Sequence, residues 1–242
     1  MDCLGAIDGT FIPIAVTHLT ADQRVPWHCR KGFLAQNVMG AVDFNMSFLY
    51  VLPGWEGSAH DSRVLRDALE KGFTVPPGRY YLADAGYAAS SGLLLTPFKK
   101  VRYHLKEWDT VGQKPKNKEE LYNLRHASAR NVVERTFGVF KARFAILSGK
   151  GRDGFSIFTQ AKLIYALTAL HNFMNVHGAD PFEEAIELER TGELVVDSTA
   201  PRSPEEIDDR VMADRRMEIA EMMWESRRNR LIRRQALGDE ED

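Results

Sequence analysis

The chain has 242 residues, of which 44% are hydrophobic and 27% charged, a composition that suits a folded protein and excludes wholesale disorder. It contains no run of about 18 apolar residues, no secretory signal at its N-terminus and no Cys-x-x-Cys pattern, so we expect neither a membrane span, nor secretion, nor a disulfide framework. The net charge of −2 conceals a basic body and an acidic C-terminal segment.

Five β-strands are predicted in the first half of the chain. Residues 5–14 are apolar at successive positions, as in a central strand that is buried on both faces. Residues 36–43 and 47–52 form a hairpin across a three-residue link. The sequence Ser58-x-x-Asp61 predicts a capping box that begins a helix. The remaining strands are expected over residues 79–84 and 93–98.

The second half is predicted to be helical. Apolar side chains recur at intervals of three and four residues over 119–147, which predicts a long helix with a buried stripe. A second helix is expected over 156–177. The stripe of the first helix comprises Val133, Phe137, Phe140, Phe144 and Leu147, and the inward side chains of the second are Ile157, Ala161, Ile164, Leu167, Leu170, His171 and Met174.

Charge divides the chain near residue 178. Residues 179–242 carry 10 Arg, no Lys and 19 Asp or Glu, a balance of −9, whereas the first 178 residues carry a balance of +7. A basic body with an acidic tail is typical of a protein that meets a polyanion, although a soluble domain with a solvated tail explains the charge equally well. We predict one domain over 1–178, followed over 179–242 by an acidic, partly disordered linker and a C-terminal helix at about 205–237.

Three carboxylates occupy positions that stability alone does not explain. Asp8 lies within the apolar strand 5–14, where an unpaired carboxylate is costly unless a cation or strong donors compensate it. Asp84 ends another apolar strand, and strand ends are frequent ligand sites. Glu134 lies beside the apolar stripe of the long helix, one turn after Arg130.

This constellation predicts both a fold and a chemistry. An Asp on a central strand, an Asp ending its neighbour and a Glu on a later helix are typical of RNase H-like nucleases. Two divalent cations, Mg²⁺ or Mn²⁺, would activate water or a 3′-hydroxyl and stabilise the leaving oxygen in attack on a phosphodiester. We therefore predict an α/β, RNase H-like fold: a mixed five-stranded sheet with strand 1 between strands 2 and 4, flanked by helices.

Longer motifs resemble the transposase domain of the PIF/Harbinger superfamily, which includes Harbinger-derived nucleases. The motifs are GAIDGTFIPI (5–14), GWEGSAHDSRVL (54–65), YLADAGY (81–87) with LTPF (95–98), and NLRHASARNVVERTFGVFK (123–141). The resemblance covers roughly residues 4–178 and implies Asp8, Asp84 and Glu134 as the catalytic triad. It implies Asp61 as a further metal ligand, while a structural role of Asp61 as the capping-box carboxylate is an equal alternative.

The resemblance also implies partners and a location. It implies a DNA endonuclease acting on transposon ends or derived sites in the nucleus, with the cytoplasm as a second location. Family members carry a helical DNA-binding region before the first catalytic Asp, which here is already residue 8. They share DNA recognition with a companion Myb-like protein. Two alternatives are therefore expected: a truncated or domain-only chain, or a chain that relies on a separate Myb-like partner. A homodimer is also expected, and no membrane association.

Residues 99–118 form a basic loop with aromatic residues in between. We predict that this loop and the cations around Glu134 bind phosphate, and that Tyr103 and Trp108 stack on unpaired bases. The alternative is a solvated, charge-rich insertion that contacts neither DNA nor another part of the protein. The DNA-binding residues expected are Lys99, Lys100, Arg102, Lys106, Arg130 and Lys141, with Arg125, Arg135 and Arg143 beside them.

Other enzyme classes fit less well. Asp8-Gly9-Thr10 is similar to part of the nucleophile loop of haloacid dehalogenase phosphatases, but that loop needs an Asp where this chain has Ala6. The seven histidines are scattered along the chain, which argues against a zinc site. The alternative left open is a domesticated DNA- or chromatin-binding module that keeps the transposase fold without catalysis.

Overall fold

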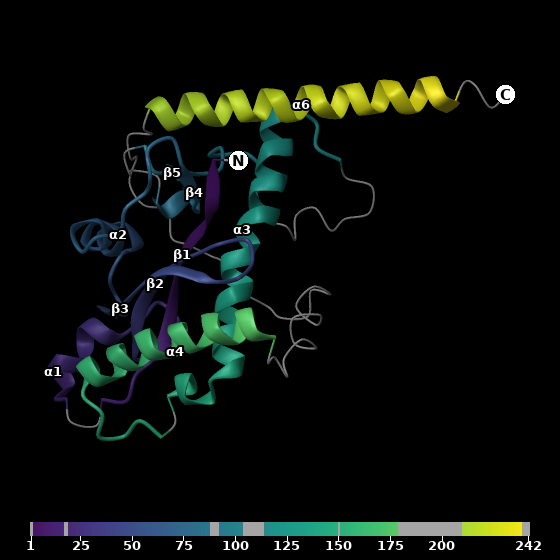
Figure 1. The fold of residues 1–242 in the computed structure, drawn as a ribbon. Helices are drawn as coiled ribbons and strands as arrows, with labels where there is room; N and C mark the ends of the chain where they lie inside the picture. The colour runs from purple at the N-terminus through teal and green to yellow at the C-terminus, as the bar shows by residue number, and fades with distance from the viewer. Residues whose placement is uncertain are drawn as a thin grey trace.

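The computed structural model describes residues 2–16, 19–87, 92–103, 114–149, 151–178 and 210–238. They form a mixed five-stranded sheet flanked by helices, with a long C-terminal helix across one end (Figure 1). The strands are β1 (Cys3–Pro13), β2 (Ala35–Val42), β3 (Phe48–Glu56), β4 (Tyr80–Leu82) and β5 (Leu94–Leu95). This architecture confirms the predicted α/β fold.

The strand order is β3-β2-β1-β4-β5. β1, β2 and β3 pair antiparallel as a meander, whereas β4 lies parallel to β1 and β5 parallel to β4. β1 is therefore central, between β2 and β4, as predicted. Its side chains alternate between the two faces of the sheet, so Ala6 and Ile12 enter one core while Ile7 enters the other.

Helices cover both faces of the sheet. α2 packs on one face, and α3 and α4 pack on the other, while α6 lies across the end of α3 (Figure 1). The helices are α1 (Ala21–Arg24), α2 (Asp61–Glu70), α3 (Lys118–Arg143), α4 (Ile157–His177) and α6 (Arg210–Gly238). Short 3₁₀ turns are η1 (Val25–Trp27), η2 (Ala85–Tyr87) and η4 (Ala145–Ser148). None of the described helices is both long and apolar enough to cross a membrane.

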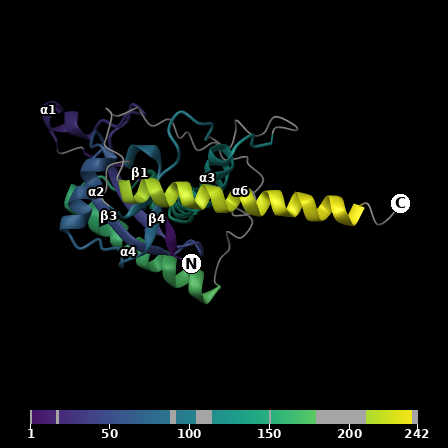
Figure 2. The same cartoon turned by 90° about the horizontal axis from the view of Figure 1, so that it is seen from above.

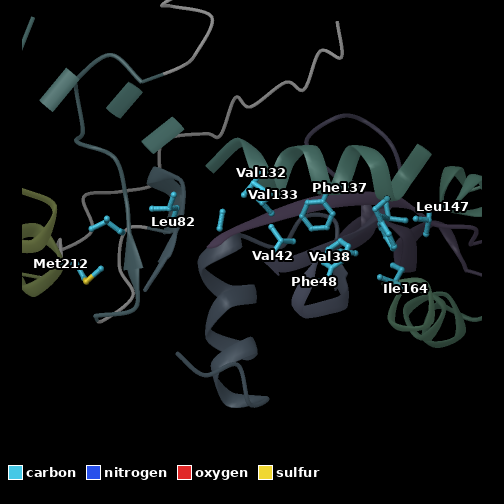
Figure 3. Close-up of a cluster of buried hydrophobic side chains, with 14 of the residues drawn as sticks. Val38, Val42, Phe48, Leu82, Val132, Val133, Phe137, Leu147, Ile164 and Met212 are labelled. Atoms are coloured by element: carbon cyan, nitrogen blue, oxygen red, sulfur yellow. The ribbon is translucent and has the colours of Figure 1, made fainter. Parts of the chain in front are cut away.

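The predicted stripe of α3 fixes that helix against the sheet. Phe137 packs against Phe48 with ring centroids 5.6 Å apart, and both side chains lie between α3 and the strands (Figure 3). A Cβ at position 40 would lie 2.6 Å from the ring of Phe137, so the helix can approach this closely only over Gly40. The close approach holds Glu134 and Arg130, one turn and two turns earlier, beside β1.

Several boundaries differ from the prediction. The capping box was wrong: α2 begins at Asp61 with His60 as its N-cap, and His60 makes no side-chain capping bond. The strands expected at 79–84 and 93–98 are shorter, and α3 ends at Arg143 before η4. On α4, His171 is buried as expected, but Leu170 is 45% exposed because it lies on the outer face of the helix.

The helix expected over 205–237 is observed as α6. Met212 and Ala220 belong to the same core as Leu82 and Leu95, so the first half of α6 packs onto the body of the domain. Ion pairs between Arg215 and Asp2 (2.6 Å) and between Lys118 and Glu221 (2.7 Å) also attach it. The predicted acidic linker lies outside the described residues.

Candidate active site

Asp8 lies on β1 and directs its carboxylate toward α3. Ile7 and Gly9, its neighbours along the strand, face α2 on the opposite side of the sheet. The Oδ1 atom of Asp8 accepts a hydrogen bond from the backbone N–H of Gly9 at 2.8 Å, and its Oδ2 accepts one from Nη1 of Arg130 at 2.9 Å. The carboxylate therefore has the compensating cation that its position in a central strand requires.

One guanidinium joins three parts of the site. Arg130 is only 6% exposed at its side chain and pairs with both Asp8 and Glu134, its neighbour one helical turn along α3. Its Nε donates to the hydroxyl of Tyr103 at 2.8 Å. Burial opposes the charge of Arg130, but the surrounding charges, led by Asp8, raise its pKa well above the usual value. In this structure Arg130 is therefore an internal counter-ion, and its contact with DNA stays a prediction.

Asp84 follows β4 and lies beside Asp8. The parallel register pairs Ala6 with Leu82, so Asp8 and Asp84 lie two residues further along neighbouring strands. The Oδ1 atom of Asp84 accepts a hydrogen bond from the N–H of Gly86 at 2.8 Å, which orients the carboxylate at the start of η2. The sheet thus places the two aspartates side by side, as the predicted strand order required.

Asp61 reaches the site as the first residue of α2. Its Oδ1 accepts a hydrogen bond from Nδ2 of Asn37 at 3.2 Å, and the same Nδ2 donates to the carbonyl of Ala59 at 3.1 Å. A Cβ at Gly9 would lie 2.7 Å from this carboxylate oxygen, so glycine allows α2 to begin this close to β1. Asn37 was missed from sequence; the available signal was a buried amide within an apolar strand.

The clustered carboxylates oppose one another's ionisation. Burial raises the pKa of Asp8 to about 7, against the opposing effect of Arg130. The charges of Asp84, Glu134 and Asp61 add to this rise. Burial likewise raises the pKa of Asp61, and the charge of Asp84 adds to it. Such a cluster is short of positive charge and favours a bound cation.

Tyr87 is a further member of the site that sequence reasoning missed. Its side chain is buried, and its hydroxyl makes no hydrogen bond to the part of the chain that the structure describes. Burial raises the pKa of Tyr87 well above the usual value, and the charges of Asp61, Asp8 and Asp84 add to the rise. Because buried hydroxyls nearly always have partners, this one could be satisfied by a ligand held among the carboxylates.

The donor set suits a hard divalent cation, because Mg²⁺ and Mn²⁺ prefer carboxylate, hydroxyl and water oxygens. Within the described ranges, no three His, Cys, Asp or Glu side chains already form a metal-binding group. Arg130 accounts for this, since its guanidinium lies between Asp8 and Glu134. The residues therefore fit a metal by chemistry, and Arg130 supplies the positive charge in this structure.

The predicted DNA-binding loop is partly described. Lys99 and Lys100 are exposed and Arg102 is half-buried. Asn123 of α3 fixes this loop, because its side-chain amide donates to backbone carbonyls of the loop, including those of Phe98 (3.1 Å) and Arg102 (3.2 Å). The loop is therefore anchored to the helix that carries Glu134. Lys106, His104 and Trp108 lie outside the described residues.

Two other cations and one aromatic residue face inward. Lys141 donates from Nζ to Oγ1 of Thr10 at 2.6 Å, and burial lowers its pKa to about 8. Tyr103 was expected to stack on bases, but its hydroxyl is bound to Arg130 inside the site. Arg143 was expected beside the DNA surface, but it is buried and donates to Nδ1 of His171 at 2.8 Å. Arg143 therefore joins α3 to α4.

The sequence around these carboxylates matches a known protein family. Residues 7–172 match a family described as DDE superfamily endonuclease. The chain belongs to this family. The match contains all four carboxylates of the site, and DDE superfamily endonucleases generally use divalent metals. The resemblance to Harbinger-type proteins expected from the motifs is confirmed by the relatives of this DDE endonuclease domain.

Three curated relatives are similar over the same region. The chain is 28% identical to human (Homo sapiens) HARBI1 over 153 residues, 27% identical to HARBI1 of Bos taurus over 161 residues, and 26% identical to an ALP1-like protein of Arabidopsis thaliana over 158 residues. These alignments cover 62%, 65% and 61% of the chain, and 40%, 42% and 37% of the relatives. The chain thus matches about two-fifths of each relative's length. No solved structure matches the chain significantly.

Proposed function

We propose that this protein is a divalent-metal-dependent endonuclease that hydrolyses phosphodiester bonds of DNA. The observation that carries the proposal is the joint placement of Asp8, Asp84 and Glu134, which come from three elements. Arg130 bridges Asp8 and Glu134, and the charges of Asp84 and Glu134 add to the rise in the pKa of Asp8 that burial causes. Membership of the DDE endonuclease family supports it. So does the similarity to HARBI1, whose name describes a candidate nuclease.

Each side chain has a distinct part in the proposed site. Asp8, Asp84 and Glu134 would hold two Mg²⁺ or Mn²⁺ ions, with Asp61 as an additional ligand fixed by Asn37. The metal ions would supply an activated water or 3′-hydroxyl and stabilise the leaving oxygen.

The surrounding cations and the loop have supporting parts. Arg130 positions Asp8 and Glu134 relative to each other. Burial lowers the pKa of Lys141, and the charge of the nearby Asp8 opposes that lowering. Lys141 would offer a cation to the phosphate that is cleaved. Lys99, Lys100 and Arg102 would hold the DNA backbone further from the reacting bond.

A binding module without catalysis is the second candidate function. Arg130 favours it, because a guanidinium already bridges two of the catalytic carboxylates and the fold needs no metal to satisfy them. For either function we propose transposon ends or derived DNA sites as the partner, and the nucleus, then the cytoplasm, as the location. A separate Myb-like protein and a second copy of the chain are the proposed protein partners.

Plasmid cleavage separates the two candidates. The 242-residue chain should nick supercoiled DNA in Mg²⁺ or Mn²⁺, and Asp8→Asn, Asp84→Asn and Glu134→Gln should each abolish nicking. Asp153→Asn is the matched control, since this exposed carboxylate lies outside the site. Nicking by Asp8→Asn at the parental rate would overturn the catalytic assignment. Metal-independent DNA binding by the parent without any nicking would favour the binding module.

A further inference from the structure

The second half of α6 is strongly basic and projects from the body of the domain. Figures 1 and 2 both show it extending past α3 and the sheet. Residues 226–238 contain five arginines and no Asp, Glu or Lys, whereas all four acidic residues of α6 precede residue 226. Beyond Arg227, every side chain from Arg228 through Arg233 is exposed. We call residues 226–238 the arginine arm.

The arm is held at its base by the body of the domain. Nη1 of Arg227 donates to the carbonyl of Pro115 at 3.0 Å, just before α3 begins. Lys118, the first residue of α3, pairs with Glu221 at 2.7 Å, less than two turns earlier on α6. The direction of the arm is therefore fixed relative to α3, the helix that carries Glu134.

Stability of the isolated helix does not explain these charges. Arg227, Arg230 and Arg233 follow one another at intervals of three residues, a spacing at which like charges are unfavourable. The helix dipole favours cations only in the last turn, and Arg227 and Arg230 lie before that turn. Arg125 on α3 adds to the cluster, since burial and the charges of Arg230 and Arg227 lower its pKa. No ion pair joins these four arginines to a described carboxylate.

We propose that the arginine arm is a contact for the phosphate backbone of duplex DNA, separate from the carboxylate site. The proposal rests on DNA as the substrate of the proposed function. Guanidinium groups pair with phosphate in a bidentate manner. The arm is about 20 Å long at about 1.5 Å per residue. That length is less than one turn of the duplex, so the arm fits along one groove.

The distribution of the arginines favours a groove over a flat acidic surface. At about 100° per residue, Arg228, Arg230 and Arg233 span about 200° of the helix circumference. A helix that enters a groove has phosphates on both sides, so cations on more than one face can be used. A flat acidic protein surface would meet only one side of the helix and leave the other cations without partners.

DNA binding without cleavage tests the proposal. In an Asp8→Asn background with EDTA, binding of the full chain to a labelled duplex of arbitrary sequence is measured by fluorescence anisotropy at several salt concentrations. The test variant replaces Arg228, Arg230 and Arg233 by Gln and leaves Arg227, which anchors the arm. The control replaces Arg66, Lys71 and Lys162, three exposed cations elsewhere, by Gln. Circular dichroism checks that both variants retain their helices.

The arm variant should bind duplex DNA more weakly than the control. Each lost phosphate contact should remove about 0.9 from the slope of log K against log salt, so three contacts remove about 2.7. An affinity and slope equal to those of the control would overturn the proposal even if the parent cleaves DNA, so its failure is distinct from failure of the catalytic site. A variant that loses binding only to a peptide of the acidic residues 180–209, and not to DNA, would also overturn it.

Discussion

Replacing Asp8 by Asn should stabilise the metal-free protein, and the gain should increase with pH. The pKa of Asp8 is raised from 3.8 to about 7 in the folded state. Between these values the folded carboxyl keeps a proton that the unfolded chain has released, so this group costs stability as the pH rises toward 7. The neutral Asn side chain avoids that cost and still offers Arg130 an oxygen acceptor.

The structure sets the size of the effect. A shift of about three pH units corresponds to about 4 kcal/mol, at about 1.4 kcal/mol for each unit. The side chain of Asp8 is 20% exposed, and the variant loses the charge that faces Arg130. Both factors reduce the gain. We therefore expect the free energy of unfolding of Asp8→Asn to exceed that of the parent by about 1–2 kcal/mol above pH 7, and by almost nothing below pH 4.

Urea unfolding in EDTA, followed by circular dichroism at pH 4, 6 and 8, measures this difference. Asp153→Asn, which removes an exposed carboxylate, should show no gain that depends on pH in this way. At pH 8, Mg²⁺ or Mn²⁺ should then raise the stability of the parent more than that of Asp8→Asn, because a ligand stabilises the state that binds it. A variant less stable than the parent at pH 8, or a gain of the same size at every pH, would refute the reasoning.

Three other variants, the last with two substitutions, test the packing and the DNA contact. Gly9→Ala places a Cβ 2.7 Å from Oδ1 of Asp61, so it should lower the free energy of unfolding in urea by about 1–3 kcal/mol. The same variant should slow plasmid nicking. Phe137→Ala removes the ring that packs against Phe48 and should lower the free energy of unfolding by about 3–5 kcal/mol, also measured by urea unfolding. Neutralising Lys99 and Lys100 should lower the salt slope of DNA binding by about 0.9 for each phosphate contact, and an unchanged slope would leave the loop without this role.

Local sequence patterns were sufficient to predict the sheet and to single out Asp8, Asp84 and Glu134 as candidate site residues. The continuous apolar run around Asp8 identified a central strand, and a central strand with an acidic residue is rare enough to indicate function. The start of α2 was wrong for a non-local reason. The N–H of Ser58 donates to the carbonyl of Pro26 at 3.1 Å, so this segment is fixed by a contact with η1 and not by its own capping box.

The directions of the arginines on α3 could not be read from spacing. This helix contacts the sheet on one side and α6 on another, so buried positions are not confined to one stripe. Arg130 donates a hydrogen bond to Asp8, which lies 122 residues away in the sequence, and Arg143 donates one to His171, which lies 28 residues away. Both partners are set by the fold as a whole. The sequence showed that cations surround Glu134, but only the structure separates the internal counter-ions from the exposed ones.

The attachment of α6 has a consequence for how the protein is made. Arg215 of this helix pairs with Asp2, 213 residues earlier, and Met212 and Ala220 enter the core beside β4 and β5. Chains emerge from the ribosome N-terminus first, so Asp2 and the strands β4 and β5 are synthesised long before their partners on α6. Contacts of such long separation form slowly. We therefore expect the domain to reach its final form only after translation of α6.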